Sequence, residues 1–587
     1  MHLVGFFLLV ILLYESSYCV MSHLPKGVYF TSLDSSGNIS MYWSLDYNQK
    51  YVRFEIHLPL RKWDWFAIGF SDYGEPYPAD LCILWSDRKW NTQFQDFWTD
   101  EIGDIHLDEK QNCEDFDIDF HEHFTKFTFS RKFDTCDEFD YVIEDGTTHI
   151  VWMKGNGLLA NLEGLNVDHA SKYGMQRTQL LKNPELQKIK FPQDTRTVEF
   201  RANNVQVPGD DTTYWCYVQK IPEFLSKIHH VIQFEAVIQS GNEGLVHHME
   251  VFHCEAAYDK DISSYNGPCT HPDRPKDTEI CKKVMAAWAM GATPFLYPKE
   301  AGLPIGGKRF NPYVMLEVHY NNPEMRSDFV DSSGVRLYVT PTLRKYNAGV
   351  MELGLEYTDK MAIPPKQESF SLSGYCISEC TAVSLPPQGI TIFGSQLHTH
   401  LTGVQVLTRH IRDGRELPEL NRDNHYSTHF QEIRLLKRPV NILPGDALIT
   451  TCRYNTEQRE NITLGGFAIK DEMCVNYVHY YPKIELEVCK SSISYQTLFT
   501  YFRYMNEWEN QNTSSQYGIS TNYGNINWNK DRVGDLQSLF DDMTLSMQCN
   551  ASTGLRFPGD WENVPLTHVH YPLPPPIRSC KQDELIV

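Results

Sequence analysis

Residues 245–254 read LVHHMEVFHC, a run in which β-branched, aromatic and other apolar residues alternate with histidines. Its length and alternation are typical of a half-buried β-strand. Successive side chains of a regular strand point to opposite faces, so His247 and His248 would diverge. Both can bind one ion only if the strand is twisted or bulged at that point. The stretch therefore predicts a strand that carries part of a candidate metal site.

Three further segments carry candidate metal ligands in strand-like surroundings. His398 and His400 lie two residues apart in GSQLHTHLTG and would share one face of a strand. His319 ends the run MLEVH, and Met473 directly precedes the strand-like segment CVNYVHYYP. Zinc and the hard cations have little use for a thioether sulfur, whereas Cu(I) binds it readily. A methionine among the candidates therefore points toward copper.

The histidine pattern alone does not select these residues. The chain contains 23 histidines, and His253, His479 and the pair His229 and His230 stand in similar strand-like runs. A histidine pair taken alone is more often incidental than a ligand, and a lone methionine is usually a core residue. The spacing suggests metal sites without defining them.

The composition describes a folded, acidic protein of the secretory pathway. A chain of 587 residues with 41% apolar residues is too long for one domain and too apolar for global disorder. Its formal net charge of -22 opposes binding to nucleic acid or to an anionic membrane. Residues 1–20 are typical of a cleaved signal peptide, and no later stretch reaches eighteen consecutive apolar residues. We therefore expect a secreted or lumenal protein without a transmembrane anchor.

The sequons and the cysteine count agree with that compartment. Asn38, Asn461, Asn512 and Asn550 each begin an acceptor triplet and are predicted glycosylation sites. Removal of Cys19 with the signal peptide leaves fourteen of the fifteen cysteines, an even number suited to seven disulfides. No CxxC pair occurs, which disfavours a thiolate metal site.

The strand-like segments predict an all-β protein with a short helical C-terminal tail. Residues 27–155 contain many short alternating runs, which are typical of a β-sandwich. Residues 211–345 and 346–492 predict two further antiparallel sandwiches. Residues 156–210 are rich in charge and proline and predict a linker, and residues 493–587 predict the tail.

From Asp211 onward the chain closely resembles the copper type II, ascorbate-dependent monooxygenases. The resemblance is carried by LVHHMEVFHC, AAWAMGA, LEVHYNNP, NAGVMELGLEY, GSQLHTHLTG, FQEIRLLK, PGDALITTCRYNTE and MCVNYVHYYP. Through WFAIGFSDYGEPYPADLCILW and FDTCDEFDYVIEDGTTHIVW, residues 27–155 resemble the DOMON domain that precedes the catalytic core in the dopamine β-hydroxylase branch. Within that branch the chain looks most similar to the dopamine β-hydroxylase-like monooxygenases. The resemblance implies a DOMON sandwich followed by two jelly-roll-like sandwiches.

The resemblance also gives roles to individual residues. It implies an electron-delivering copper held by His247, His248 and His319. It implies an oxygen-binding copper held by His398, His400 and Met473, with catalytic roles on Tyr214 and again on His398. The implied disulfides are Cys136–Cys580, Cys216–Cys269, Cys254–Cys281, Cys376–Cys489, Cys380–Cys549 and Cys452–Cys474. Counting then leaves Cys82 and Cys113 as a possible seventh pair.

The implied reaction is hydroxylation of a C–H bond, for which a redox metal is needed. The resemblance implies O2, two copper ions per chain and ascorbate as the electron donor, with a benzylic carbon of a phenylethylamine-like aromatic amine as the leading expectation. Two alternatives stand: a secreted copper-binding protein without hydroxylase activity, and an adhesive β-sandwich protein in which the histidines are incidental. The stretch ENQNTSSQYGIS lacks the late cysteine pair that links subunits in the dopamine β-hydroxylase branch. We expect no disulfide-linked dimer by that route, while non-covalent association stays open.

Overall fold

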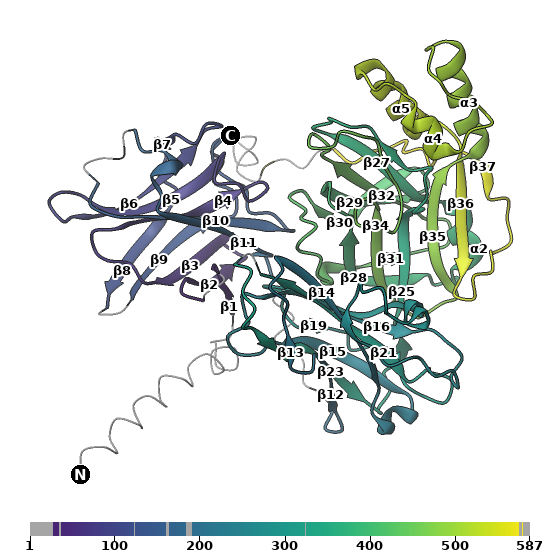
Figure 1. Ribbon diagram of the computed structural model, residues 1–587, viewed down its shortest axis with the longest axis horizontal. Coiled ribbons are helices and arrows are strands. Elements are labelled where there is room, and N and C mark those ends of the chain that lie inside the picture. Colours follow the sequence, from purple (N-terminus) through teal and green to yellow (C-terminus); the bar gives the residue numbers. More distant parts are fainter. Residues whose placement is uncertain are drawn as a thin grey trace.

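The computed structural model describes residues 27–574 and Arg578, except 35–36, 122–123, 160–161, 163, 183–190 and 323. The predicted signal peptide lies outside the described residues. The chain forms three β-sandwiches in sequence order, with the longer helices beside the third one (Figure 1). The all-β prediction is confirmed. None of the described helices is long and apolar enough to cross a membrane.

The first sandwich packs two antiparallel sheets against each other. Their strand orders are β1-β2-β3-β9-β8 and β11-β10-β4-β5-β6-β7. The strands are β1 (Val28–Ser32), β2 (Ser40–Asp46), β3 (Tyr51–Leu58), β4 (Trp65–Ser71), β5 (Ala79–Ser86), β6 (Thr92–Thr99), β7 (Ile105–Leu107), β8 (Glu114–Phe120), β9 (Thr125–Lys132), β10 (Thr148–Gly155) and β11 (Lys172–Thr178). Trp43, Phe54, Phe66 and Trp152 are buried together in its core.

The second sandwich carries His247, His248 and His319. One sheet has the order β12-β23-β15-β20-β24, with β19 paired to β15, and the other has the order β17-β14-β21-β16-β18. The strands are β12 (Arg196–Arg201), β13 (Val205–Gln206), β14 (Thr212–Lys220), β15 (His229–Val237), β16 (Val246–Cys254), β17 (Asn266–Pro268), β18 (Cys281–Ala289), β19 (Phe295–Leu296), β20 (Ala301–Ile305), β21 (Tyr313–Asn321), β22 (Val330–Asp331), β23 (Gly334–Thr340) and β24 (Tyr346–Asn347).

The third sandwich pairs a sheet of order β31-β28-β34-β25-β35-β36-β37 with one of order β27-β32-β29-β30. The strands are β25 (Gly349–Leu355), β26 (Ala362–Ile363), β27 (Phe370–Cys376), β28 (Ile390–His398), β29 (Gly403–Arg412), β30 (Arg415–Asp423), β31 (Arg434–Ile442), β32 (Ala447–Tyr454), β33 (Thr463–Leu464), β34 (Val475–Tyr481), β35 (Leu486–Ile493), β36 (Leu545–Ala551) and β37 (Glu562–Val564). The helices are α2 (Ser378–Ser384), α3 (Tyr495–Glu507), α4 (Ile519–Gly524) and α5 (Lys530–Asp542).

Two predicted boundaries need correction. The predicted linker, 156–210, supplies β11 to the first sandwich and β12 to the second, where they pair with β10 and β23. The predicted helical tail, 493–587, also supplies β36 and β37 to a sheet of the third sandwich. β11 and β12 lie at sheet edges, where a strand needs only one hydrogen-bonded neighbour and tolerates charged side chains. Their short, polar patterns therefore resemble loop sequence.

Six disulfides join described cysteines. They are Cys82–Cys113 in the first sandwich, Cys216–Cys269 and Cys254–Cys281 in the second, and Cys376–Cys489, Cys380–Cys549 and Cys452–Cys474 in the third. The same pairs follow from the family resemblance and, for Cys82–Cys113, from counting. The implied pair Cys136–Cys580 includes Cys580, which lies outside the described residues.

The predicted glycosylation sites differ in exposure. Asn38, Asn461 and Asn512 are exposed. Asn550 is half-buried in β36, and its Oδ1 atom is buried without a hydrogen-bond partner among the described residues. The surface position of a glycan therefore suits the first three sequons better than the fourth.

The first sandwich docks onto the third through a buried polar network. The backbone N–H and the hydroxyl of Thr147 both donate to the carboxylate of Asp423, at 3.1 and 2.7 Å. Arg434 forms an ion pair with the same carboxylate at 2.8 Å. Asp423 is 1% exposed, so the charge is compensated entirely by these neighbours. The network holds the first sandwich in a defined position beside the other two.

Candidate metal centres

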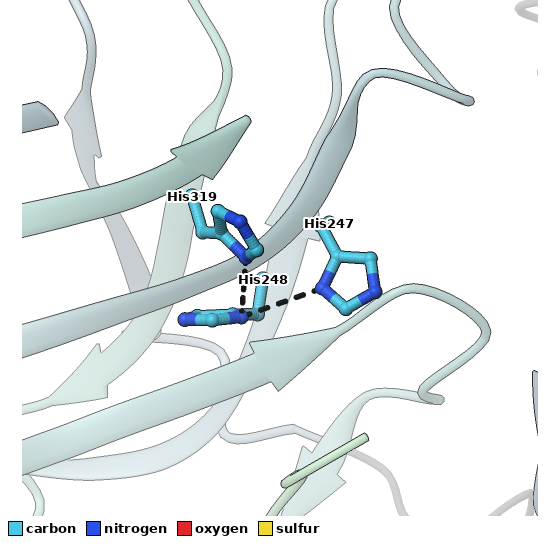
Figure 2. Close-up of side chains that lie close together, drawn as sticks. All are labelled: His247, His248 and His319. Carbon is cyan, nitrogen blue, oxygen red and sulfur yellow. Dashed lines mark hydrogen bonds between the residues drawn. The ribbon is translucent and has the colours of Figure 1, made fainter. Parts of the chain in front are cut away.

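The first candidate metal centre lies on the neighbouring strands β16 and β21. The Nδ1 atom of His248 lies 3.1 Å from Nδ1 of His319 and 3.5 Å from Nδ1 of His247 (Figure 2). Three nitrogens bound to one metal at about 2.0–2.1 Å stand roughly 3.3–3.6 Å apart. The three side chains therefore have the spacing of a three-nitrogen metal site.

A β-bulge brings the two adjacent histidines to one point. Val246 pairs with Tyr320 and His248 pairs with His319, so His247 is the extra residue on β16. A bulge re-aims the side chain of the unpaired residue. This is the distortion that the sequence required if both histidines were to bind one ion.

Burial keeps the rings of this centre neutral. Desolvation, followed by the neighbouring histidines, holds the pKa of His247 and of His248 far below the ordinary value. Desolvation also lowers the pKa of His319 to about 4. A neutral imidazole offers a lone pair to a metal ion, whereas an imidazolium does not. At neutral pH all three rings are ready to act as ligands.

The second candidate centre lies between the end of β28 and the start of β34. His398 is the last residue of β28, and the ring centroids of His398 and His400 lie 5.3 Å apart. The sequence predicted one strand face for both, but the strand ends at His398. The Nδ1 atom of His398 lies 2.5 Å from Oε1 of Gln431, and Nδ1 of His400 donates to the carbonyl of Asp471 at 2.9 Å. These bonds leave Nε2 of each ring for a metal.

One buried carboxylate holds His400 and Met473 together. Oε2 of Glu472 accepts the backbone N–H of His400 at 2.9 Å and that of Met473 at 3.1 Å. Oε1 of the same side chain accepts the backbone N–H and the hydroxyl of Thr402, at 2.6 and 2.8 Å. Met473 itself is 6% exposed. Four donors on one carboxylate therefore fix the chain on both sides of this centre.

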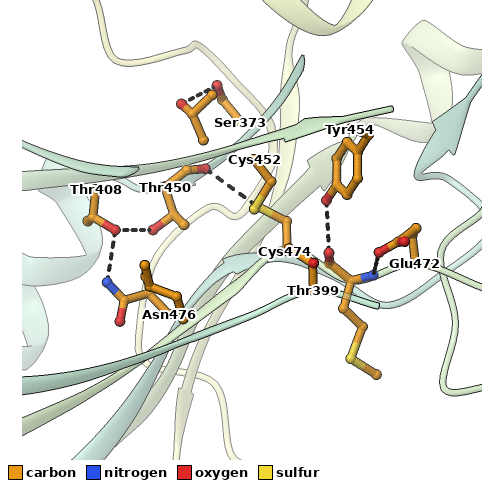
Figure 3. The surroundings of a disulfide bond; sticks show 12 residues. Ser373, Thr399, Thr408, Thr450, Cys452, Tyr454, Glu472, Cys474 and Asn476 are labelled. Atoms are coloured by element: carbon orange, nitrogen blue, oxygen red, sulfur yellow. Dashed lines mark hydrogen bonds between the residues drawn. A yellow bond between two sulfur atoms is a disulfide. The ribbon is translucent and has the colours of Figure 1, made fainter. Parts of the chain in front are cut away.

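A disulfide and a tyrosine anchor the same segment from the other side. Cys474, which follows Met473, is bonded to Cys452 of β32. The hydroxyl of Tyr454 donates to the carbonyl of Met473 at 2.8 Å (Figure 3). Two imidazoles and a thioether form a donor set suited to Cu(I), which is the set expected from the sequence for this centre. The segment is thus held at four successive positions around the methionine.

The two centres lie on facing surfaces of the second and third sandwiches. Gln396, two residues before His398, donates from Nε2 to Oε1 of Glu250 at 3.2 Å. Glu250 lies two residues after His248, so it shares the strand face of that ligand. This hydrogen bond joins the two ligand-bearing strands, β16 and β28, across the domain boundary. The two groups of candidate ligands therefore lie on strands that contact each other across the domain boundary.

Comparisons with known proteins agree with these donor sets. Family models match residues 35–155 (DOMON domain), 198–327 (copper type II ascorbate-dependent monooxygenase, N-terminal domain) and 346–502 (the C-terminal domain of the same family). Dopamine beta-hydroxylase of Homo sapiens is 45% identical over 554 residues, which cover 94% of this chain and 89% of that protein. The chain belongs to the copper type II ascorbate-dependent monooxygenase family. It is an oxidoreductase of the copper-dependent monooxygenases.

Two other relatives refine the placement within these monooxygenases. Tyramine beta-hydroxylase of Caenorhabditis briggsae is 37% identical over 90% of this chain and 90% of that protein. DBH-like monooxygenase protein 1 of Homo sapiens is also 37% identical, over 78% of this chain and 74% of that protein. Identity to human dopamine beta-hydroxylase is higher than to either. These numbers confirm the family and do not favour the narrower resemblance to dopamine β-hydroxylase-like monooxygenases.

Tyr214 of this monooxygenase stacks on a ligand of the first centre. Its ring lies parallel to that of His319, with the centroids 4.4 Å apart and the planes at 2°. The two residues are paired neighbours on β14 and β21. Burial, then the charges of Glu317 and Glu250, raises the pKa of Tyr214. The neutral phenol therefore fixes the orientation of the His319 imidazole.

The other histidines considered from the sequence have structural partners away from both centres. The ring of His253 donates to the carbonyl of Asn311 at 3.0 Å, and the ring of His479 is buried against Phe295. His229 bonds to the carbonyl of Lys227 and His230 bonds to Asn347. They are therefore not brought into either candidate site.

The sequence did not reveal the residues that support the ligands. Glu472 is adjacent to Met473, and Gln431 lies in the family-like segment FQEIRLLK, but neither position was given a role. His429 was also missed, although its ring centroid lies 5.8 Å from that of His247. A carboxylate beside a candidate ligand was a usable signal for Glu472. No local pattern pointed to Gln431 or His429, because both act on residues of distant segments.

Proposed function

We propose that this monooxygenase hydroxylates the benzylic carbon of an aromatic amine, using O2 and two electrons from ascorbate. The observation that supports the proposal is the cluster of His247, His248 and His319 on β16 and β21, with β16 bonded to the strand that carries His398. His247, His248 and His319 would hold the copper that receives electrons. His398, His400 and Met473 would hold the copper that binds O2, because two imidazoles and a soft sulfur favour Cu(I). Copper, when bound, supplies the one-electron chemistry that an unactivated C–H bond requires.

The protein contributes preorganised, neutral ligands to this reaction. Desolvation lowers the pKa of His398 to about 4, with the neighbouring His400 adding to the effect. The bond to Gln431 fixes which nitrogen of His398 is free, and the bond to Asp471 does the same for His400. These hydrogen bonds fix the orientation of both rings before a metal binds, so the side chains need not rearrange on metal binding. Tyr214 is a positioning residue in this proposal because it acts through His319.

An amine substrate suits the acidic surface between the centres. Glu250 is half-buried on that surface, and Gln396 is the hydrogen-bond donor found for it among the described residues. Burial raises the pKa of this carboxyl, while the bond from Gln396 opposes the rise. A half-buried carboxylate with so little compensation is stabilised by a cation. A substrate ammonium would supply that cation.

Substitution of this carboxylate tests the amine preference separately from the chemistry. Glu250→Gln keeps the shape and the contact with Gln396 but removes the charge. We expect the KM for tyramine to rise at least tenfold, with the copper content unchanged. An unchanged KM would show that the ammonium binds elsewhere.

The decisive experiment uses the mature, glycosylated chain. Copper per chain is quantified, and ascorbate-dependent O2 consumption is followed with tyramine and with a glycine-extended peptide. Two copper ions per chain with uptake for tyramine alone supports the proposal. Uptake for the peptide alone would overturn the amine assignment.

The alternative is a secreted copper-binding protein without hydroxylase activity. It predicts copper in both centres with no O2 consumption for either substrate. The retained pair of donor sets and the interdomain bond between β16 and β28 argue against it, because a storage site needs neither. The disulfides joining described cysteines support a secreted or vesicular location, since such bonds persist in oxidising compartments.

A further inference from the structure

A small cavity lies where the three sandwiches meet, and His247 forms part of its wall. Its volume is about 130 Å³. Met175 and Arg177 of β11 line it from the first sandwich, and His429 and Phe430 line it from the third. One water needs about 10–15 Å³ of such space, so the cavity has room for a small organic molecule of roughly ten heavy atoms. It adjoins the first metal centre on the side of the DOMON domain.

The guanidinium of Arg177 has no partner in the part of the chain that the structure describes. Its Nε atom is buried without a hydrogen-bond partner. Burial lowers the pKa of Arg177 to about 10, although the charge of Glu75 acts in the opposite direction. A desolvated guanidinium without a hydrogen-bonded anion is costly, and its planar donors match the oxygens of a small organic anion. The side chain therefore lacks the anionic partner that its chemistry calls for.

The cavity connects that unpartnered cation to the first centre. The ring centroids of His247 and His429 lie 5.8 Å apart. Arg177 and His247 both line the cavity. Asp34 is the acidic residue among the described lining residues, and its Oδ1 accepts the N–H of Ile39 at 2.8 Å. The positive end of the cavity is thus next to a ligand of the electron-receiving copper.

We propose that this cavity binds the electron donor, a small enediol monoanion of the ascorbate type, with Arg177 as its anion-binding residue and His247 as the contact to the metal centre. The inference rests on the proposed function, because it takes the first centre as the copper that receives electrons. In each encounter the donor monoanion loses one electron and one proton and becomes a radical anion. A cupric ion held by His247, His248 and His319 would accept the electron, and the proton would leave to solvent.

The net charge makes a dedicated anion site necessary. A chain with a formal charge of -22 repels an anionic donor over most of its surface. A half-buried cation in the cavity wall compensates for this locally. β11 carries Arg177 and is held by pairing with β10, where Arg177 lies opposite His149. The DOMON domain would therefore complete the donor site of the catalytic domains.

Substitution of Arg177 in the copper-loaded full chain tests the inference. Arg177→Gln removes the charge, Arg177→Lys keeps it, and Lys172→Gln removes one charge from the exposed start of β11 as the matched control. The readout is the rate at which the cupric EPR signal is lost under anaerobic conditions, with ascorbate and with an uncharged phenylenediamine as donors. Thermal unfolding and copper content verify each variant.

We expect Arg177→Gln to slow reduction by ascorbate at least tenfold and to raise the KM for ascorbate, not that for tyramine. Arg177→Lys should retain most of the rate, and Lys172→Gln all of it. Reduction by the uncharged donor should be the same in every variant. Equal rates with ascorbate in wild type and Arg177→Gln, or an equal slowing with both donors, would overturn the inference.

A binding measurement on the wild-type chain does not depend on the variants or on turnover. Ascorbate added to the copper-free protein should protect the amides of β11 from hydrogen exchange, and absence of protection contradicts the inference. Arg177-dependent binding without hydroxylation would contradict the proposed function alone. Hydroxylation of tyramine without any dependence on Arg177 would contradict this inference alone.

Discussion

The two candidate metal centres are built in different ways, although the strands β16 and β28 that carry them contact each other. The first takes its ligands from paired positions of two neighbouring strands, and one bulge on β16 is enough to converge them. The second takes its ligands from the end of β28 and from the residue before the disulfide cysteine Cys474. Its geometry depends on hydrogen bonds to the carboxylate of Glu472, the side-chain oxygen of Gln431 and the carbonyl of Asp471.

Because of this difference, the two centres should respond differently to substitution. A sheet register fixes the three-nitrogen centre as part of the fold, so it resists change as long as the sheet forms. The centre with Met473 lies outside regular strand pairing and is held by a supporting shell of polar groups. Substitutions in that shell should alter the second centre while the first stays intact.

The largest effect should follow from removal of the sulfur. Met473→Leu conserves volume, so we expect the unfolding temperature to change little, while turnover falls at least about 100-fold because a copper ligand is lost. Turnover and thermal unfolding are measured on the same preparation. Met351→Leu, at a buried methionine of the same sandwich, is the matched control and should keep full activity. Retained turnover in Met473→Leu would refute the assignment.

Loss of the supporting carboxylate should act on one centre only. Glu472→Gln replaces the carboxylate that accepts the backbone N–H groups of His400 and Thr402 with an amide. We expect copper affinity at the second centre to fall roughly 10–100-fold, as is typical of residues that orient ligands, with the first centre unchanged. Competition titration with a Cu(I) chelator measures both. Glu356→Gln, at another buried carboxylate of the third sandwich, is the control. Equal loss of copper from both centres would show that Glu472 does not act on the second centre alone.

The copper-free protein should lose stability in mild acid. The pKa of His319 and of His398 is about 4 in the folded chain, below the ordinary value of 6.5. A lowered folded-state pKa means that the unfolded chain binds more protons between these values. Stability is therefore fully present above about pH 6.5 and falls toward pH 4, on the order of 1–3 kcal/mol per ring. Urea unfolding at several pH values measures this. A flat profile over that range would contradict the burial of neutral rings.

The smallest effect should come from Tyr214. Tyr214→Phe keeps the ring that stacks on His319, and we expect its kcat to stay within about twofold of wild type. Tyr214→Ala removes the stacking and should broaden the cupric EPR signal of the first centre while leaving the second unchanged. A large loss of kcat in Tyr214→Phe with an unchanged EPR signal would instead give the hydroxyl a chemical role.

Sequence reasoning predicted the strands and, through family resemblance, six candidate ligands, but not the residues that support them. Strand geometry alone predicts that His247 and His248 can bind one ion only if the strand is twisted or bulged. Gln431 and Arg177 could not be assigned because they lie next to residues of distant segments, whereas Glu472 could have been noticed from its position beside Met473. β11 was assigned to a linker because an edge strand with a polar pattern resembles a loop. Its arginine was therefore not considered beside a metal centre.

Copper X-ray absorption of the fully reduced protein tests the central claim most directly. The account predicts two copper ions per chain and a sulfur scatterer in the wild-type spectrum. Because one of the two ions carries the sulfur, the average is one sulfur for every two copper ions. In Met473→Leu the sulfur contribution should vanish while the nitrogen contribution of the three-histidine centre persists. A wild-type spectrum without sulfur, or a sulfur contribution unchanged in Met473→Leu, would contradict the account.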